Sequence, residues 1–192
     1  MPKIVVDSQG NFVTSENKEA WLEARLNGVT ATEAGKIAAG GKQKEKLFQS
    51  KLTGNIESME PNAYMQHGTD REEYILRYIK EKYGAEHNTY LYESTENPHH
   101  LATPDGVSDD YVVEVKASIK SLPELIATYN NQMQWQMYVM DVEKVLFVVE
   151  THKNFIPMST EEAFIVRDDK KIDHLRTQAE QFMENLHNAR KN

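Results

Sequence analysis

The sequence has 192 residues, of which 39% are hydrophobic, which is enough chain to bury one core without covalent cross-links. It contains no cysteine, which excludes disulfides and also iron–sulfur or zinc sites held by thiolates. The net charge of −8 argues against a protein that coats nucleic acid non-specifically, but it does not exclude an enzyme with a local basic groove. We expect a single domain over residues 1–192.

Nothing in the sequence predicts a membrane protein. No apolar run approaches the roughly 20 residues that a membrane-spanning helix needs. The N-terminal stretch MPKIVVDSQG lacks the basic and apolar regions of a signal peptide. We therefore expect a cytoplasmic protein without a membrane partner.

Helical patterns dominate the N-terminal part of the chain. The stretch TSENKEAWLEARLNG predicts a helix that is capped by Ser15 and stopped by Gly28. The stretch TATEAGKIAAGG predicts a second helix, capped by Thr30 or Thr32. Polar and apolar side chains three and four apart predict further helices over residues 42–52 and 63–83.

Beyond residue 83 the pattern alternates, which is typical of strands. Strands are predicted over residues 88–94, 100–103, 111–118, 144–152 and 163–169. The apolar run KVLFVVETH indicates a strand that is covered on both faces. Helices are predicted over residues 123–140 and 169–189. This order of elements predicts an α/β sandwich with a helical N-terminal part.

The stretch LATPDGVSDDYVVEVKAS gathers charged side chains around a turn. Strand alternation puts Glu114 and Lys116 on one face. An antiparallel pairing through the turn at residues 108–110 would bring Asp105 close to Glu114. Two carboxylates at close range repel each other, and a divalent cation such as Mg²⁺ would compensate them. The alternative, which these residues alone leave open, is a solvated strand face beside an ordinary turn.

Several ordered motifs carry a family resemblance. TPDG followed by EVK, preceded by MQHGTDREEY and followed by NNQMQWQMYVM, resembles the lambda-type (YqaJ-like) phage exonucleases of the PD-(D/E)XK nuclease superfamily. The resemblance covers roughly residues 20–150. It implies a restriction-endonuclease-like core, in which helices flank a central mixed β-sheet.

The resemblance also implies roles for individual residues. Asp105 and Glu114 would bind Mg²⁺, with Mn²⁺ as a substitute, and Lys116 would be catalytic. The family also implies that the backbone carbonyl of Val115 and the side chain of Glu72 belong to the metal site. It implies that Gln134, paired with Tyr138 on a helix, helps to hold the attacking water or the phosphate. Taken without the family, Glu72 is a solvated acid and the glutamines of this helix form a polar face or an oligomer contact.

A second group of residues resembles the family's pocket for a terminal 5′ phosphate. Arg25 and Thr32 stand seven apart, and an Arg fork with a hydroxyl at a helix N-terminus suits an anion. Thr103 is a further candidate for this pocket, and Lys120 for contact with the DNA backbone. Five lysines, at positions 36, 42, 44, 46 and 51, form either a phosphate track or a solvated helix face.

The resemblance therefore implies a Mg²⁺-dependent exonuclease that digests double-stranded DNA ends from 5′ to 3′. Such an enzyme would be encoded by a phage or prophage and would act in the cytoplasm of a bacterial host. Its expected partners are a single-strand annealing protein and copies of itself in a trimer. The alternatives are a structure-specific or site-specific endonuclease of the same superfamily, and a non-catalytic DNA-binding protein that kept the fold.

Overall fold

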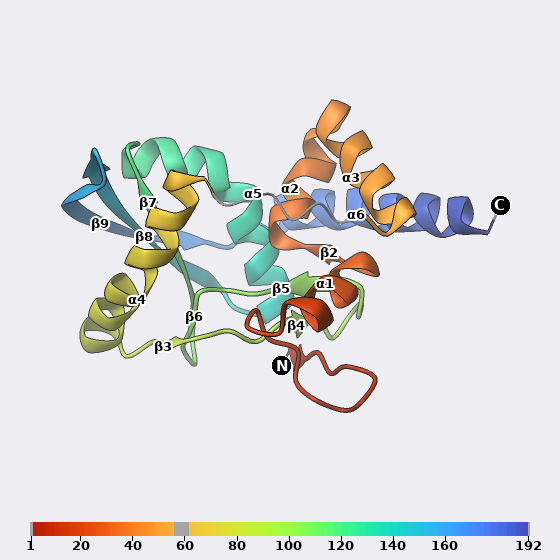
Figure 1. Cartoon of the computed structure of the whole chain (residues 1–192), viewed down its shortest axis with the longest axis horizontal. Helices are drawn as coiled ribbons and strands as arrows, with labels where there is room; N and C mark the ends of the chain where they lie inside the picture. Colours follow the sequence, from red (N-terminus) through yellow and green to blue (C-terminus); the bar gives the residue numbers. More distant parts are fainter. Residues whose placement is uncertain (1, 56–61, 192) are drawn as a thin grey trace.

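A computed structural model describes residues 2–55 and 62–191. Its centre is a five-stranded sheet in the order β3-β6-β7-β8-β9. The strands are β3 (Glu86–His87), β6 (Gly106–Val107), β7 (Val112–Ser118), β8 (Lys144–Lys153) and β9 (Ile156–Val166). β7 and β8 pair in parallel, and the other neighbours pair antiparallel. The central sheet is therefore mixed, as expected (Figure 1).

Two helices, α4 (Ala63–Tyr83) and α5 (Leu122–Met140), cover opposite faces of this sheet. The side chain of Asn62 caps α4, and Gly84 ends the helix in the left-handed conformation with φ of 74°. The apolar run of β8 is fully buried between the two helices, which confirms the prediction of a strand covered on both faces. None of the helices in the described residues has both the length and the apolar character needed to cross a membrane.

The rest of the chain forms a smaller sheet and a helical layer. The small sheet has the order β1-β4-β5-β2. Its strands are β1 (Lys3–Ile4), β2 (Val29–Thr30), β4 (Tyr92–Glu93) and β5 (His100–Ala102). The helical layer consists of α2 (Ala31–Ala39), α3 (Gly41–Thr53) and α6 (Asp169–Arg190), whereas α1 (Lys18–Leu26) packs against Leu91 and Leu101 beside the small sheet. Trp135 of α5 and Phe182 of α6 lie in one core with α2, so the helical layer is joined to the central sheet through α5.

The predicted helix boundaries agree with the structure at most ends. α4 has the predicted range of 63–83, and Thr30 rather than Thr32 precedes α2 as its cap residue. The first helix differs, because Asn17 caps it, and not Ser15. The Asn17 side chain accepts the N–H of Ala20, and Ser15 instead lies in the turn that follows the bridge between Thr14 and Tyr90.

The strands differ more from the prediction. Of the strand expected over 88–94, only β4 (Tyr92–Glu93) forms, and β3 (Glu86–His87) precedes this range and belongs to the other sheet. The strand predicted over 100–103 pairs with β2 and β4, so β6 is the actual antiparallel partner of β7. β9 begins at Ile156, well before the predicted start at residue 163, because it is an exposed edge strand without clear alternation. Short strands β1 and β2 also interrupt the N-terminal part, which is therefore not wholly helical.

Candidate active site

Asp105 is held against strand β7 by two backbone contacts. Its N–H donates to the carbonyl of Val113 at 3.0 Å. Its carboxylate Oδ2 accepts the N–H of Val115 at 2.7 Å. The antiparallel pairing of Gly106 with Val113 sets this geometry, because it lays the Pro-Asp-Gly turn alongside β7. The expected approach of Asp105 to the Glu114 strand is thus present.

Glu114 is a buried carboxylate, 1% exposed, that faces α5. Its Oε2 accepts the side-chain N–H of Gln136 at 2.6 Å. Its Oε1 accepts from the amide of Gln132 and from the ammonium group of Lys116. A buried charge is tolerated only when it is paired and hydrogen-bonded, and these three donors satisfy Glu114.

Lys116 lies among oxygen atoms on the same face of β7. Besides Glu114, its Nζ donates to the carbonyl of Val115 at 3.0 Å, and it lies 5.1 Å from the ring centre of Tyr129. Burial disfavours the charged amine, but the carboxylates of Glu114 and Asp105 outweigh burial and raise the pKa of Lys116. The side chain is therefore a stable cation at neutral pH.

Acidic side chains crowd this corner of the sheet. Burial, and after it the charge of Glu114, raises the pKa of Asp105 well above its usual range. Burial also raises the pKa of Glu72, against the opposing effects of His87 and Lys116. The charges of Lys116 and Glu114 affect the pKa of Glu72, which places the Glu72 side chain on the side of α4 that faces Glu114 and Lys116.

The neighbour of Glu72 on α4 points elsewhere. Glu73 pairs with Arg77 at 2.9 Å on the exposed side of the helix. The rotation of about 100° per residue separates the two acids, as expected, and Glu72 is the one on the inner side.

The donor set suits a hard cation. Asp105, Glu114 and the Val115 carbonyl offer oxygen ligands, which Mg²⁺ prefers while it keeps several of its waters. Glu114 Oε1 and the Val115 carbonyl already face one positive group, the Lys116 ammonium. The raised pKa of Asp105 indicates that a further positive charge would relieve the crowding. No preformed group of three or more His, Asp or Glu metal ligands occurs in residues 2–55 and 62–191, so water and the carbonyl would have to complete the coordination.

The structure does not bring Gln134 and Tyr138 to this cluster. The amide of Gln134 donates to the Val166 carbonyl at 2.9 Å and accepts the N–H of Asp168 at 2.8 Å. It therefore ties α5 to the junction of β9 and α6. The hydroxyl of Tyr138 lies 2.9 Å from Nδ1 of His100, inside the core.

Gln132 and Gln136 occupy the place expected for Gln134. The sequence carries a signal for them: they continue the stripe of Leu125 and Tyr129 at spacings of three and four, and this stripe packs on the sheet. Gln134 is rotated by about 100° from Met133, which packs on the central sheet. It therefore lies on the side of α5 that carries Tyr138 and faces the core shared with α2 and α6.

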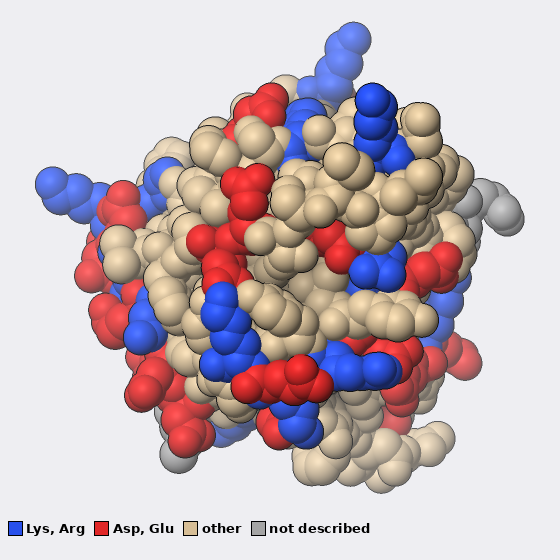
Figure 2. All heavy atoms as spheres, turned by 90° about the vertical axis from the view of Figure 1, so that its left-hand side faces the viewer, with Lys and Arg blue, Asp and Glu red and all other residues tan. Residues whose placement is uncertain are grey.

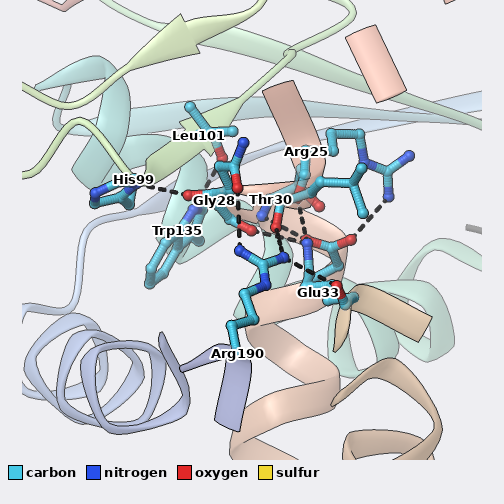
Figure 3. Close-up of polar contacts among 11 residues, drawn as sticks. Arg25, Gly28, Thr30, Glu33, His99, Leu101, Trp135 and Arg190 are labelled. Atoms are coloured by element: carbon cyan, nitrogen blue, oxygen red, sulfur yellow. Dashed lines mark hydrogen bonds and ion pairs between the residues drawn. The ribbon is translucent and has the colours of Figure 1, made fainter. Parts of the chain in front are cut away.

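The candidate phosphate pocket lies where α1, β2 and α2 meet. Arg25 lies over the ring of Trp21 at 4.2 Å, and its Nη2 contacts Glu33 at 3.1 Å (Figure 3). The Nε of Arg25 is buried and has no partner among the described residues. Thr32 is exposed in the first turn of α2. A guanidinium with an unused donor and a hydroxyl in the first turn of a helix are each groups that suit an anion.

This pocket keeps a positive balance although Glu33 lies within it. Burial alone would raise the pKa of Glu33, but Lys51 and Arg25 lower it, so the side chain is ionised. Arg190 adds a third cation through contacts to the carbonyls of Leu26 at 3.1 Å and Lys51 at 2.9 Å (Figure 3). Lys51 and Arg25 therefore act on the Glu33 carboxylate, and Arg190 lies close enough to Lys51 to act on that lysine.

The strand pairing connects the pocket to the carboxylate cluster. β2 runs parallel to β5, with Thr30 opposite Leu101, and Thr103 and Asp105 follow directly in the chain. Lys120 is exposed just beyond β7. Lys51 does not join an exposed lysine track, because it is 1% exposed and its Nζ donates to the Gly28 carbonyl at 2.8 Å.

Known proteins share this arrangement of elements. A family model described as YqaJ-like viral recombinase domain matches residues 20–143. The chain is similar to an alkaline exonuclease, LHK-Exo, from Laribacter hongkongensis, with 27% identity, a TM-score of 0.73, and 90% of this chain and 94% of that chain covered. The structure of LHK-Exo in complex with dAMP aligns with a TM-score of 0.74, at the same identity and over the same shares of both chains.

A more distant structure shares the fold alone. A phage related exonuclease from Haemophilus somnus 129PT is 17% identical, with a TM-score of 0.67 over 84% of this chain and 95% of that chain. A search of curated protein sequences found no match. The alignments with these exonucleases confirm the expected restriction-endonuclease-like fold.

Proposed function

The chain belongs to the YqaJ-like viral recombinase domain family, and from this premise we propose that it is a Mg²⁺-dependent 5′ to 3′ exonuclease of double-stranded DNA ends. A nuclease role is supported by the similarity to the alkaline exonuclease. The observation that carries the proposal is the buried Glu114, with Asp105 and Lys116 beside it on one strand pair. The complex of the similar exonuclease with dAMP is consistent with a mononucleotide product.

Asp105, Glu114, the Val115 carbonyl and Glu72 would hold the Mg²⁺, for which Mn²⁺ would substitute. When bound, the ion would polarise a phosphodiester and lower the pKa of a water molecule. Gln132 and Gln136 keep Glu114 oriented by donating to both of its carboxylate oxygens. Lys116 supplies a fixed positive charge next to the scissile phosphate, where negative charge builds up during attack by water.

Arg25 and Thr32 would bind the terminal 5′ phosphate, with Thr103 at the end of β5 completing this pocket. Capture of each new 5′ phosphate would favour digestion in the 5′ to 3′ direction. The same proposal includes a trimer around the DNA and a partner protein that anneals single strands. The process would be phage-type recombination in the cytoplasm of a bacterial host. All of these expectations rest on the family resemblance.

The proposal is tested with Asp105→Asn and a matched control, Asp109→Asn, which changes an exposed acid in the next turn. With 5′-phosphorylated linear duplex and Mg²⁺, we expect Asp105→Asn to lower kcat by at least about 100-fold, because a ligand charge is lost. The control should retain the native rate. A closed circular duplex should resist the native protein, and cutting of the circle would favour an endonuclease instead.

We also expect Arg25→Gln to reduce the preference for a 5′-phosphorylated end over a 5′-hydroxyl end by about tenfold, since a charge-assisted hydrogen bond to the phosphate is removed. The measurement is the ratio of initial rates on the two ends. Arg77→Gln, an exposed arginine on α4, is the control. An unchanged ratio in Arg25→Gln would remove this residue from the phosphate pocket.

A further inference from the structure

Aromatic side chains gather at the tip of the β8–β9 hairpin, beside the start of α4. We call Tyr64, His67, His152 and Phe155 the hairpin aromatic cluster. The rings of His67 and His152 lie 4.5 Å apart, and Phe155 stacks on His152 at 5.6 Å. Tyr64 lies 5.1 Å from Phe155. α4 is fixed to the hairpin here, because Arg71 contacts both carboxylate oxygens of Glu150 at 2.7 and 2.9 Å.

A pocket of about 440 Å³ opens beside this cluster. Its lining residues are Tyr64, Ile119, His152, Lys153, Asn154 and Phe155. Tyr64 is 59% exposed and Phe155 41% exposed, so both offer ring surface to solvent. This end of the molecule faces the viewer in Figure 2, where uncharged side chains cover much of the surface between separate basic and acidic groups.

Two ring nitrogens at the cluster have no hydrogen-bond partner in the part of the chain that the structure describes. His152 is 5% exposed, and its Nδ1 is buried without a hydrogen bond in the described residues. The Nε2 of His67 is in the same situation. Buried polar atoms of this kind are normally satisfied, so the two imidazoles indicate a ligand with polar groups at its edge.

The hairpin turn keeps Phe155 in an unfavourable backbone conformation. Asn154 and Phe155 form the two-residue turn with φ of 52° and 64°. Such turns strongly favour Asn followed by Gly, because the second position also needs positive φ. A bulky residue with positive φ is an outlier, so the backbone conformation of the turn does not favour phenylalanine. We attribute the phenylalanine to the aromatic ring that it adds to the cluster.

The cluster lies close to the candidate active site. β7 and β8 run in parallel, with Lys116 opposite Val149 and Ser118 opposite Thr151. Ile119 of the pocket is three residues beyond Lys116, which is at most roughly 10 Å of extended chain. The exposed Lys153 lines the pocket, and the exposed Lys120 follows Ile119 in the chain; amines of this kind suit a phosphate backbone.

We propose that the hairpin aromatic cluster binds one unpaired nucleobase at the DNA end, next to the scissile phosphate. The base would stack on Tyr64 and Phe155, its polar edge would face His152, which lines the pocket, and Lys153 would contact the adjoining phosphate. Stacking on aromatic rings tolerates every base, which suits a nuclease without sequence preference. This inference deepens the proposed function, on which it rests.

The test uses a duplex whose single-stranded overhang carries the fluorescent base 2-aminopurine, in Mg²⁺ and with Lys116→Met protein to prevent cutting. We expect binding to quench the fluorescence. Tyr64→Leu and Phe155→Asn, added to that background, should weaken binding of the overhang by roughly fivefold or more and reduce the quench. Phe155→Asn should keep its fold, since Asn tolerates the positive φ at this position.

The matched controls are Tyr90→Leu and Phe12→Asn, which change an exposed aromatic pair in the N-terminal part. Both should leave affinity and quench unchanged. Native affinity and quench in both cluster variants would overturn the inference, even if the native protein digests DNA. A fall in the mass of the assembly in the cluster variants would overturn it as well, and would make this surface a contact between copies. If the native protein does not digest DNA while the Lys116→Met protein still quenches 2-aminopurine, the proposed function is overturned and the binding inference is not.

Discussion

Replacing Lys116 with methionine should lower kcat on 5′-phosphorylated linear duplex by about 10²–10³-fold, the range seen when one group that stabilises developing charge is removed. The methionine keeps the length of the side chain and its contact with Tyr129, but it cannot donate to Glu114 or to the Val115 carbonyl. Initial rates in Mg²⁺ measure the effect. Lys170→Met, which changes an exposed lysine of α6, is the control and should act at the native rate.

The same variant has a second expected result, in stability. Without Lys116, the buried Glu114 keeps only its two amide donors, so the free energy of unfolding without metal should fall by about 1–3 kcal/mol. The loss is below that of a fully buried pair because the Lys116 side chain is 27% exposed. Mg²⁺ should raise the melting temperature of the variant more than that of the native protein, since the ion replaces the missing cation. Equal shifts in both proteins would contradict a metal site at Glu114.

Replacing Lys51 with methionine should lower the free energy of unfolding by about 3–5 kcal/mol, the usual cost of removing one partner from a buried ion pair. Lys51 is 1% exposed, and its Nζ contacts Glu33 at 3.1 Å and the Gly28 carbonyl at 2.8 Å. It also donates to the Arg25 carbonyl, so it joins α1, the bend before β2, and α2 to α3. Urea unfolding followed by circular dichroism measures the change.

Two further variants make the Lys51 result specific. Lys42→Met removes an exposed lysine from the same helix and should change stability by less than about 0.5 kcal/mol. The double variant Lys51→Met with Glu33→Gln should recover part of the loss, because the buried carboxylate that keeps only Arg25 as its charged partner is then neutral. A loss below about 1 kcal/mol in Lys51→Met alone would mean that water reaches Glu33 and that this network is not closed.

Local sequence patterns predicted the elements whose neighbours in the chain determine them. The 63–83 helix has its cap residue, its apolar stripe and its terminal glycine within one segment, and its boundaries agree with the structure. The continuous apolar run of β8 predicted burial on both faces, which the structure confirms. Alternation placed Glu114 and Lys116 on one face of β7, and they contact each other there.

Contacts between distant segments were predicted less well. β9 has no clear alternation, because its pairing with β8 rather than its own side chains keeps it extended. Residues 100–102 have the composition of a strand beside β7 but pair with β2 and β4 instead. Lys51 resembles the other lysines of its helix, and its burial is explained only by partners from other segments, the Glu33 carboxylate and the Gly28 and Arg25 carbonyls.

The sequence by itself determined the chemistry of the site: which carboxylates and which amine stand close together along one turn and one strand. Strand geometry alternates every two residues, so this information is local. The tertiary structure decided which helix face meets that strand, and it chose Gln132 and Gln136 over Gln134. It also brought the hairpin tip to the start of α4. Packing between segments far apart in the chain makes these choices, because the free energy of burying one helix face or another depends on the partner surface and not on the helix alone.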